Sequence, residues 1–192
     1  MVKRIMEKSM FSDFQLRRWM TMLDDIASYK NGTFPFGGIV ASLEGEFSLG
    51  DFTHDLDMQW DKLWFPLEAM YAVELDGGEI SQHDKGKMVE ECYRFLRLEL
   101  VKQMISVIDA YQQDSKAIPF SRLADYFKAT LGFGKHLVNA TEWELWIVTL
   151  DAAQYDWSES KNERETTLAK MRNFLVNQFG QVVTTGFGKL NQ

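Results

Sequence analysis

The sequence predicts an all-α protein, and three observations support this fold class. Apolar residues recur at helical spacing along most of the 192 residues, no segment alternates as a half-buried strand does, and caps or glycines separate the apolar stretches. Hydrophobic residues make up 45% and aromatic residues 14% of the chain, more than a disordered protein carries. We therefore expect a multi-helix bundle.

The first two helices are expected at residues 12–30 and 35–47. Ser12 and Gln15 have capping-box spacing at the start of the first helix. Pro35 suits the first turn of the second helix, because its ring fixes a helical φ and its missing N–H would be unpaired there in any case.

A third helical stretch covers residues 51–75 and contains Pro66. Proline removes one backbone donor, so a kink or break is expected at residues 63–65. Ser81, with Asp84 three residues on, marks the start of the longest helix, which is expected at residues 81–112, either unbroken or bent near Leu98.

The second half of the sequence repeats this helical pattern. Thr141 and Glu144 have capping-box spacing before the apolar run that begins at Trp143. The expected elements are a helix, a loop and two further helices, at residues 119–131, 132–140, 143–157 and 161–179.

Rare residues recur in the same order in both halves, which indicates an internal duplication. The matching landmarks are Pro35 with Pro119, Trp60 with Trp143, Trp64 with Trp146, and Tyr71 with Tyr155. We expect two helical units, residues 1–98 and 99–192, that share the long central helix. Each alone would leave an apolar face uncovered, so they are expected to pack into one globular body.

Negative charge is concentrated in the first unit. The net charge is −7 and the pI is about 5.0, which argues against nucleic acid as a partner, because phosphate contacts need clustered basic residues. Residues 44–79 hold ten acids and one base, a net charge of −9, whereas residues 125–162 hold six acids and three bases, or −3. This difference between duplicated units suggests that one became specialised for a partner.

The expected location is the cytoplasm. Charged residues interrupt the apolar residues at the N-terminus, and no apolar run approaches the length of a membrane span, so neither a signal peptide nor a membrane partner is expected. The one cysteine, Cys92, lies in an apolar helical stripe and is interpreted as a buried structural thiol.

No motif in the sequence indicates catalysis, a metal or a cofactor. The three histidines, His54, His83 and His136, lack metal-ligand spacing and are interpreted as solvated or helix-start residues. The Gly-Phe-Gly-Lys segment at residues 132–135 lacks a complete phosphate-loop frame. Glu68 and Asp151 form either a paired acid site or, as we favour, ordinary paired helix carboxylates. The chain is therefore expected not to be an enzyme.

Residues 16–98 resemble a family of small helical bacterial proteins encoded beside polymorphic toxin genes. The similarity lies in a Tyr-Lys-Asn-Gly spacer, a helix ending in Leu43-Glu44, an acidic stretch, and the run Trp60-x-x-x-Trp64-x-x-Leu67-Glu68-x-x-Tyr71-Ala72-x-x-Leu75-Asp76-x-Gly78. Pro66 and the second helical half depart from the family pattern. The resemblance implies an immunity protein of a polymorphic toxin or contact-dependent growth inhibition system.

That role implies a monomer that binds a cognate toxin, which we expect to be basic, for example a nuclease. A dense acidic patch would increase both the association rate and the specificity for such a partner. Phe47 and Phe52 are expected to be exposed aromatic anchors within it. The candidate partner-binding residues are Glu44, Glu46, Phe47, Asp51, Phe52, Asp55, Asp57 and Asp61.

Two alternative functions remain open at this stage. The aromatic residues around Trp60 and Trp143 could line a pocket between the two halves of a small-ligand-binding or regulatory protein, although aromatics at helical spacing more often form a core. A metal-dependent helical hydrolase would require a bound metal ion.

Overall fold

Helices account for every regular element in the computed structural model, which describes residues 11–114, 119–137, 139–155 and 161–187. This result confirms the expected all-α class. The chain divides into two compact units, which we call the N-terminal unit, Phe14–Leu96, and the C-terminal unit, from Arg97 onward. None of the described helices combines the length and the apolar character needed to cross a membrane.

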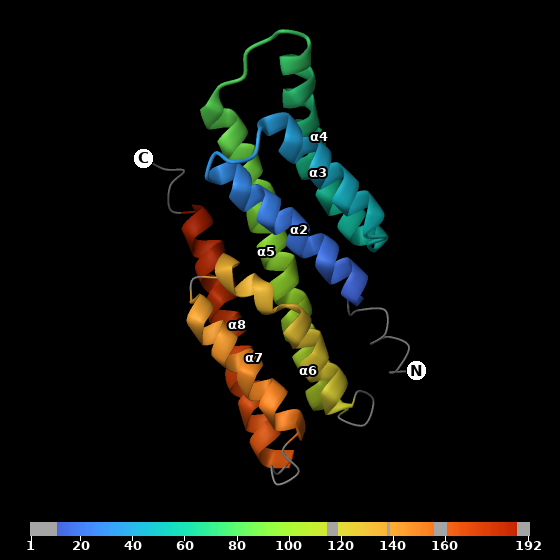
Figure 1. The fold of residues 1–192 in the computed structure, drawn as a ribbon, viewed down its shortest axis with the longest axis vertical. Helices are drawn as coiled ribbons and strands as arrows, with labels where there is room; N and C mark the ends of the chain where they lie inside the picture. The colour runs from blue at the N-terminus through green and yellow to red at the C-terminus, as the bar shows by residue number, and fades with distance from the viewer. Residues whose placement is uncertain (1–10, 115–118, 138, 156–160, 188–192) are drawn as a thin grey trace. The chain divides into compact units, whose positions relative to one another are not determined.

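The N-terminal unit is built from helices α2, α3 and α4 and the first part of α5, which continues into the C-terminal unit. Their bounds are α2 Asp13–Lys30, α3 Phe36–Leu49, α4 His54–Leu75 and α5 Gln82–Gln113. Pro35 immediately precedes α3 in extended conformation, so the proline starts this helix as expected. Helices α3 and α4 pack side by side (Figure 1).

Five aromatic rings from all four helices and the α3–α4 turn form the core of the N-terminal unit. We call this group the aromatic cluster, and its members are Trp19, Phe47, Phe52, Trp60 and Phe95. Phe47 stacks on Trp60 with ring centroids 4.7 Å apart and an interplanar angle of 8°. Trp19 also donates a 2.8 Å hydrogen bond from its indole nitrogen to the backbone oxygen of Leu96. Each aromatic pair adds about 0.5–1.5 kcal/mol beyond the burial of its surface.

The turn between α3 and α4 depends on the small size of Gly50. A Cβ atom at this position would overlap the ring of Phe52, which folds back onto Trp19 at a centroid distance of 4.9 Å. Asp51 follows with φ of +47°, in the left-handed region that aspartate tolerates better than most residues. Gln15 donates a 2.9 Å hydrogen bond to the backbone oxygen of Asp51, which fixes the turn against α2.

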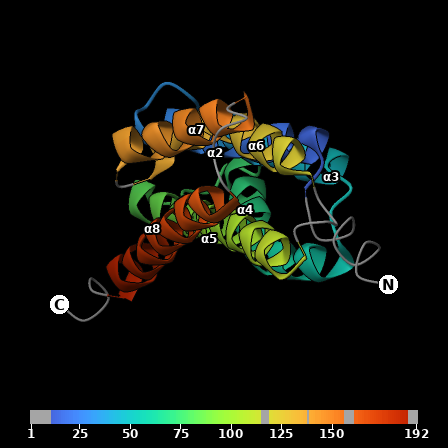
Figure 2. The same ribbon diagram turned by 90° about the horizontal axis from the view of Figure 1, so that it is seen from below.

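The C-terminal unit contains the rest of α5 together with α6, η1, α7 and α8. The bounds are α6 Phe120–Ala129, the 3-10 helix η1 Leu131–His136, α7 Ala140–Tyr155 and α8 Lys161–Phe187. Within this unit α6 and α7 form one layer, and α5 with α8 form the other (Figure 2). Arg172 of α8 binds both carboxylate oxygens of Asp109 on α5.

Several sequence expectations need correction. Helix α4 continues through Pro66 without a break, whereas α5 runs unbroken across Leu98, as one of the two predicted alternatives had it. Residues 132–136, expected in a loop, belong to η1, where Gly134 packs closely against the ring of Trp143. Helix α8 extends beyond residue 179, where we expected it to end.

The cap of α7 is also different from the one expected. The backbone N–H of Glu142 donates to the side-chain oxygen of Asn139 at 3.2 Å, and the amide of Asn139 donates to the Glu142 carboxylate at 2.7 Å. Asn139 rather than Thr141 therefore caps this helix, because α7 begins at Ala140. The capping box at Ser81 and Asp84 forms as the sequence predicts.

Both units contain a cluster of one tyrosine, one phenylalanine and one cation. In the N-terminal unit Phe36 lies 6.1 Å from Tyr29, between ring centroids, and 5.3 Å from the Lys85 ammonium nitrogen. In the C-terminal unit Phe120 lies 6.0 Å from Tyr111 and 4.9 Å from the guanidinium carbon of Arg164. Burial raises the pKa of both tyrosines, and the neighbouring cation opposes that shift.

We predict that Gly50→Ala lowers the free energy of unfolding by about 1–3 kcal/mol, because the new methyl group must displace the Phe52 ring. The matched control is Gly45→Ala in α3, where an added Cβ meets nothing within 4 Å. That control should raise stability by about 0.5–1 kcal/mol through helix propensity. Urea unfolding followed by circular dichroism measures both, and equal effects of the two substitutions would contradict the prediction.

We also predict that Asn139→Ala destabilises the protein by about 1 kcal/mol, because α7 loses the side chain that caps its first turn. Thr141→Ala should cost much less, since Asn139 already occupies the capping position. Thermal unfolding of the two variants tests this assignment. A larger loss of stability for Thr141→Ala would show that Thr141 caps the helix, as the sequence predicted.

Candidate functional site

The predicted partner-binding residues lie at the end of α3, in the α3–α4 turn and in the first two turns of α4. We call five of their carboxylates the acidic face: Glu44, Asp51, Asp55, Asp57 and Asp61. Four of the five are exposed and Asp57 is half-buried. Four of the five, Glu44, Asp51, Asp57 and Asp61, are spread over 17 positions of the sequence but lie together on one surface of the N-terminal unit.

This surface contains a pocket of about 400 Å³, which we call the aromatic pocket. Its acidic lining residues are Glu44, Asp51, Asp57 and Asp61. Five aromatic residues also line it, namely Phe47, Phe52, Trp60, Trp64 and Phe65. The pocket therefore combines negative charge with aromatic walls, and Asp55 lies outside it.

Helical spacing explains why these groups converge. On α4, Asp57 and Asp61 are four residues apart, and Trp60 and Trp64 have the same spacing, so each pair lies on one side of the helix. Three of the five aromatic wall residues, Phe47, Phe52 and Trp60, belong to the aromatic cluster, and Trp60 is only 3% exposed and stacks on Phe47. The pocket walls are thus held in place by the core of the unit.

Within the described part of the chain, the carboxylates of the aromatic pocket are not neutralised by basic side chains. Among the residues that the structure describes, none of Glu44, Asp51, Asp57 and Asp61 forms an ion pair, and no lysine or arginine lines the pocket. Asp57 and Asp61 are like charges at i and i+4, an arrangement that destabilises a helix by a few tenths of a kcal/mol. Asp57 lies in the first turn of α4, where the helix dipole favours a negative charge, whereas Asp61 lies beyond that turn and gains no such stabilisation.

Glu46, also predicted as a partner-binding residue, differs from these four carboxylates because it forms an ion pair. The Nη1 atom of Arg18 lies 2.9 and 3.1 Å from the two carboxylate oxygens of Glu46. Both side chains are partly buried, and their ion pair links α2 with α3. Sequence spacing did not reveal this pair, because its members are 28 positions apart.

The expectation that Phe47 and Phe52 are exposed anchors is wrong. Their exposed fractions are 7% and 8%, because both rings belong to the aromatic cluster. The exposed apolar side chains beside the acidic face are instead Phe65, Met58 and Leu49, which are 60%, 50% and 56% exposed. The sequence carried one signal for Phe65 and Met58, since on α4 they lie four residues after and three residues before Asp61.

The cysteine, the histidines and the two other carboxylates considered in the sequence analysis do not form a second site in the described structure. Burial, followed by the nearby Glu91 charge, raises the pKa of the Cys92 thiol to about 12, which keeps it protonated and unreactive at neutral pH. Asp151 accepts a 3.0 Å hydrogen bond from Lys128, whereas Glu68 is exposed on α4. His54 and His83 are exposed, but His136 is buried beside Phe133, so the solvated interpretation is wrong for that residue.

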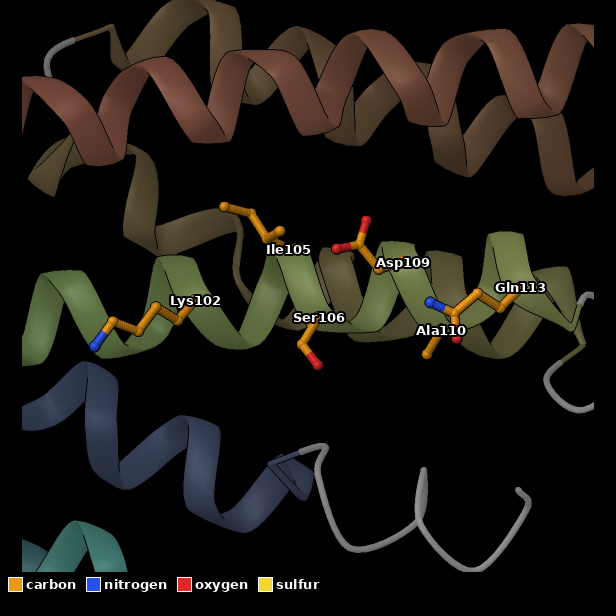
Figure 3. Close-up of a pocket in the computed structure, with 6 residues that line it drawn as sticks. All are labelled: Lys102, Ile105, Ser106, Asp109, Ala110 and Gln113. Carbon is orange, nitrogen blue, oxygen red and sulfur yellow. The ribbon is translucent and has the colours of Figure 1, made fainter. Parts of the chain in front are cut away.

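Two other surface pockets lack the several aromatic walls of the aromatic pocket. One of about 450 Å³ is lined by six residues that all project from α5 (Figure 3). Two of its charged residues are already paired, Lys102 with Glu99 and Asp109 with Arg172. Another, of about 540 Å³, lies beside the Asn139 cap of α7 and is lined mainly by amide side chains of α8.

The fold and the site together define a helical bundle with an anionic, aromatic-lined pocket. Comparison with models of known protein families, with curated proteins and with solved structures found no match. Within the described residues, no group of three or more histidine, cysteine, aspartate and glutamate side chains is placed to hold a metal ion.

We predict that Asp61→Lys raises the free energy of unfolding by about 0.5 kcal/mol at low salt, because it replaces a repulsive i,i+4 pair with an attractive one. Most of the gain should disappear at high salt, where exposed charges are screened. The control is Glu144→Lys, an equal change of charge at an exposed position of α7 with no charged residue four positions away. Chemical unfolding at two salt concentrations measures both, and a loss of stability in Asp61→Lys would mean that the carboxylate has a structural role.

Proposed function

We propose that this chain is a cytoplasmic immunity protein that binds and neutralises a cognate bacterial toxin domain, and that it has no catalytic activity of its own. The observation that carries the proposal is the aromatic pocket, where four carboxylates without ion-pair partners in the described structure surround aromatic walls. The resemblance of residues 16–98 to immunity proteins of polymorphic toxin systems points to the same role.

Physical chemistry supports a basic partner. Exposed carboxylates that repel one another lose part of that repulsion when a positively charged surface docks on them. Long-range attraction of this kind can raise association rates by roughly tenfold to a thousandfold at low salt. A toxin that attracts the phosphates of nucleic acid, such as a nuclease, would present a complementary surface.

Exposed apolar groups beside the acidic face supply the second component of a binding surface. Phe65, Met58 and Leu49 are each at least half exposed, and burying them would stabilise a complex. Charge at this surface would then steer the encounter and select the partner, while the apolar groups would slow dissociation. We propose that the protein acts as a monomer in this complex.

The small-ligand alternative is weaker on the present structure. Trp60 is 3% exposed and Trp143 is fully buried, and each ring packs against phenylalanines of its own unit. Trp143 also donates a hydrogen bond from its indole nitrogen to the backbone oxygen of Thr130. These contacts favour a core role for both residues.

We also propose that the two units arose by duplication and share α5 as a common helix. The tyrosine, phenylalanine and cation clusters support this idea, because Phe36 and Phe120 each follow a proline at the start of a helix. The buried positions of α4 and α7 also match. Trp60, Trp64 and Leu67 of α4 correspond to Trp143, Ile147 and Leu150 of α7, and all six residues are buried. In this alignment Trp64 corresponds to Ile147 rather than to Trp146.

The direct test is co-expression with the toxin encoded beside this gene, scored by growth and by co-purification at low salt. We predict that the wild-type chain restores growth and that Asp55→Lys combined with Asp61→Lys weakens binding at least tenfold, because two attractive charges become repulsive. Titration calorimetry of the purified pair gives the dissociation constants.

The matched control combines Asp125→Lys with Glu144→Lys, which makes the same change of net charge at exposed positions of the C-terminal unit. This control should bind nearly as well as wild type. Absence of binding by the wild-type chain at low salt would contradict the immunity proposal. Equal losses of affinity in the two double variants would show that the effect depends on net charge and not on the acidic face.

A further inference from the structure

Three basic side chains of the N-terminal unit sit in the same local arrangement. Arg18 lies over the ring of Phe14, with 4.8 Å from guanidinium carbon to centroid, and pairs with Glu46. Lys30 lies 4.5 Å from the ring centroid of Tyr93 and pairs with Glu90.

Lys85 repeats this arrangement with Phe36 and Glu74. In each case one cation contacts an aromatic ring and a carboxylate together, which combines a cation–π interaction with an ion pair. The unit thus uses this triad three times within its described residues.

The aromatic pocket contains two of the three components of such a triad. Its walls supply aromatic rings, including Trp64 and Phe65, and its rim supplies carboxylates, including Asp57 and Asp61. No basic side chain lines it within the described part of the chain. A volume of about 400 Å³ leaves room for a side chain contributed by another molecule.

We propose that the aromatic pocket binds the guanidinium group of a single arginine side chain presented by the partner protein. This inference rests on the proposed function, and it adds the chemical group that anchors the partner. It is carried by the cavity and its aromatic walls together with the recurring triad, not by the number of acids.

Arginine fits this pocket better than lysine for two physical reasons. A guanidinium group is planar and weakly hydrated, so it stacks on tryptophan and phenylalanine rings at a lower desolvation cost than an ammonium group. Its several N–H donors can also reach two carboxylates at once, and Asp57 and Asp61 lie four residues apart on α4. An ammonium group offers only a compact point charge.

The walls are held ready for a ligand before binding. Trp60 stacks on Phe47, and Phe52 is held against Trp19, so these rings need little rearrangement. A pre-organised site loses less conformational entropy on binding. Phe65, which is 60% exposed, is the lining residue with the most freedom to close over an entering side chain.

The test uses the full chain and three small probes: N-acetyl-arginine amide, its neutral isostere N-acetyl-citrulline amide, and N-acetyl-lysine amide. Nuclear magnetic resonance of the ¹⁵N-labelled protein follows the indole signals of Trp60 and Trp64 and the backbone signal of Phe65. We expect saturable shifts with the arginine probe, weaker ones with lysine and none with citrulline.

A paired variant, Glu44→Gln with Asp57→Asn, keeps the shape of the pocket while removing two charges, and it should weaken arginine binding at least about tenfold. Glu144→Gln on α7 is the control and should leave the titration unchanged. Circular dichroism establishes that each variant is folded.

The proposal is overturned if the arginine probe causes no shifts, if the shifts lie away from the pocket, or if citrulline or lysine binds as tightly. These titrations need no toxin, so the two proposals can fail separately. If the pocket binds arginine but the chain does not bind the toxin, only the immunity proposal is contradicted. If the chain binds the toxin but does not respond to arginine, only the arginine-pocket proposal is contradicted.

Discussion

Packing of the Phe52 ring against Trp19 holds together the part of the molecule on which the proposed site depends. The contact positions the α3–α4 turn, and α4 starts two residues later at His54. Trp60 then stacks on Phe47, so the same rings that fill the core also form the walls of the aromatic pocket. The stability of the unit and the shape of the proposed site therefore depend on one group of side chains.

Much of the fold followed from local sequence signals. Pro35 and Pro119 precede α3 and α6, and the Ser81–Asp84 box precedes α5, because these signals act through the backbone within one helical turn. The errors arose where two local signals competed or where packing decided. The sequence predicted a cap at Thr141, but the structure uses Asn139, two residues earlier, because α7 begins at Ala140. Pro66 did not break α4, since a missing donor costs less when the rest of the helix is packed.

The candidate site was predictable in its charge but not in its walls. A run of ten acids and one base in residues 44–79 marked the surface. Helical periodicity could not show that Phe52 turns inward, because a residue in a turn has no helical face. Phe47, by contrast, continues the apolar stripe of Val40 and Leu43 on α3, so its burial could have been predicted. Nor could it show that Arg18 neutralises Glu46, since that pair joins segments far apart in the sequence. Tertiary contacts of this kind separate the carboxylates that remain available from those that serve the fold.

The left-handed backbone of Asp51 has a consequence for how recognition can change over time. Its neighbours Gly50 and Phe52 are constrained by packing, but Asp51 itself is exposed, and asparagine adopts the same backbone conformation readily. Mutation can therefore alter the charge at this position while the turn keeps its shape. If the proposed partner diverges, a single substitution at Asp51 can therefore change the surface without changing the fold beneath it.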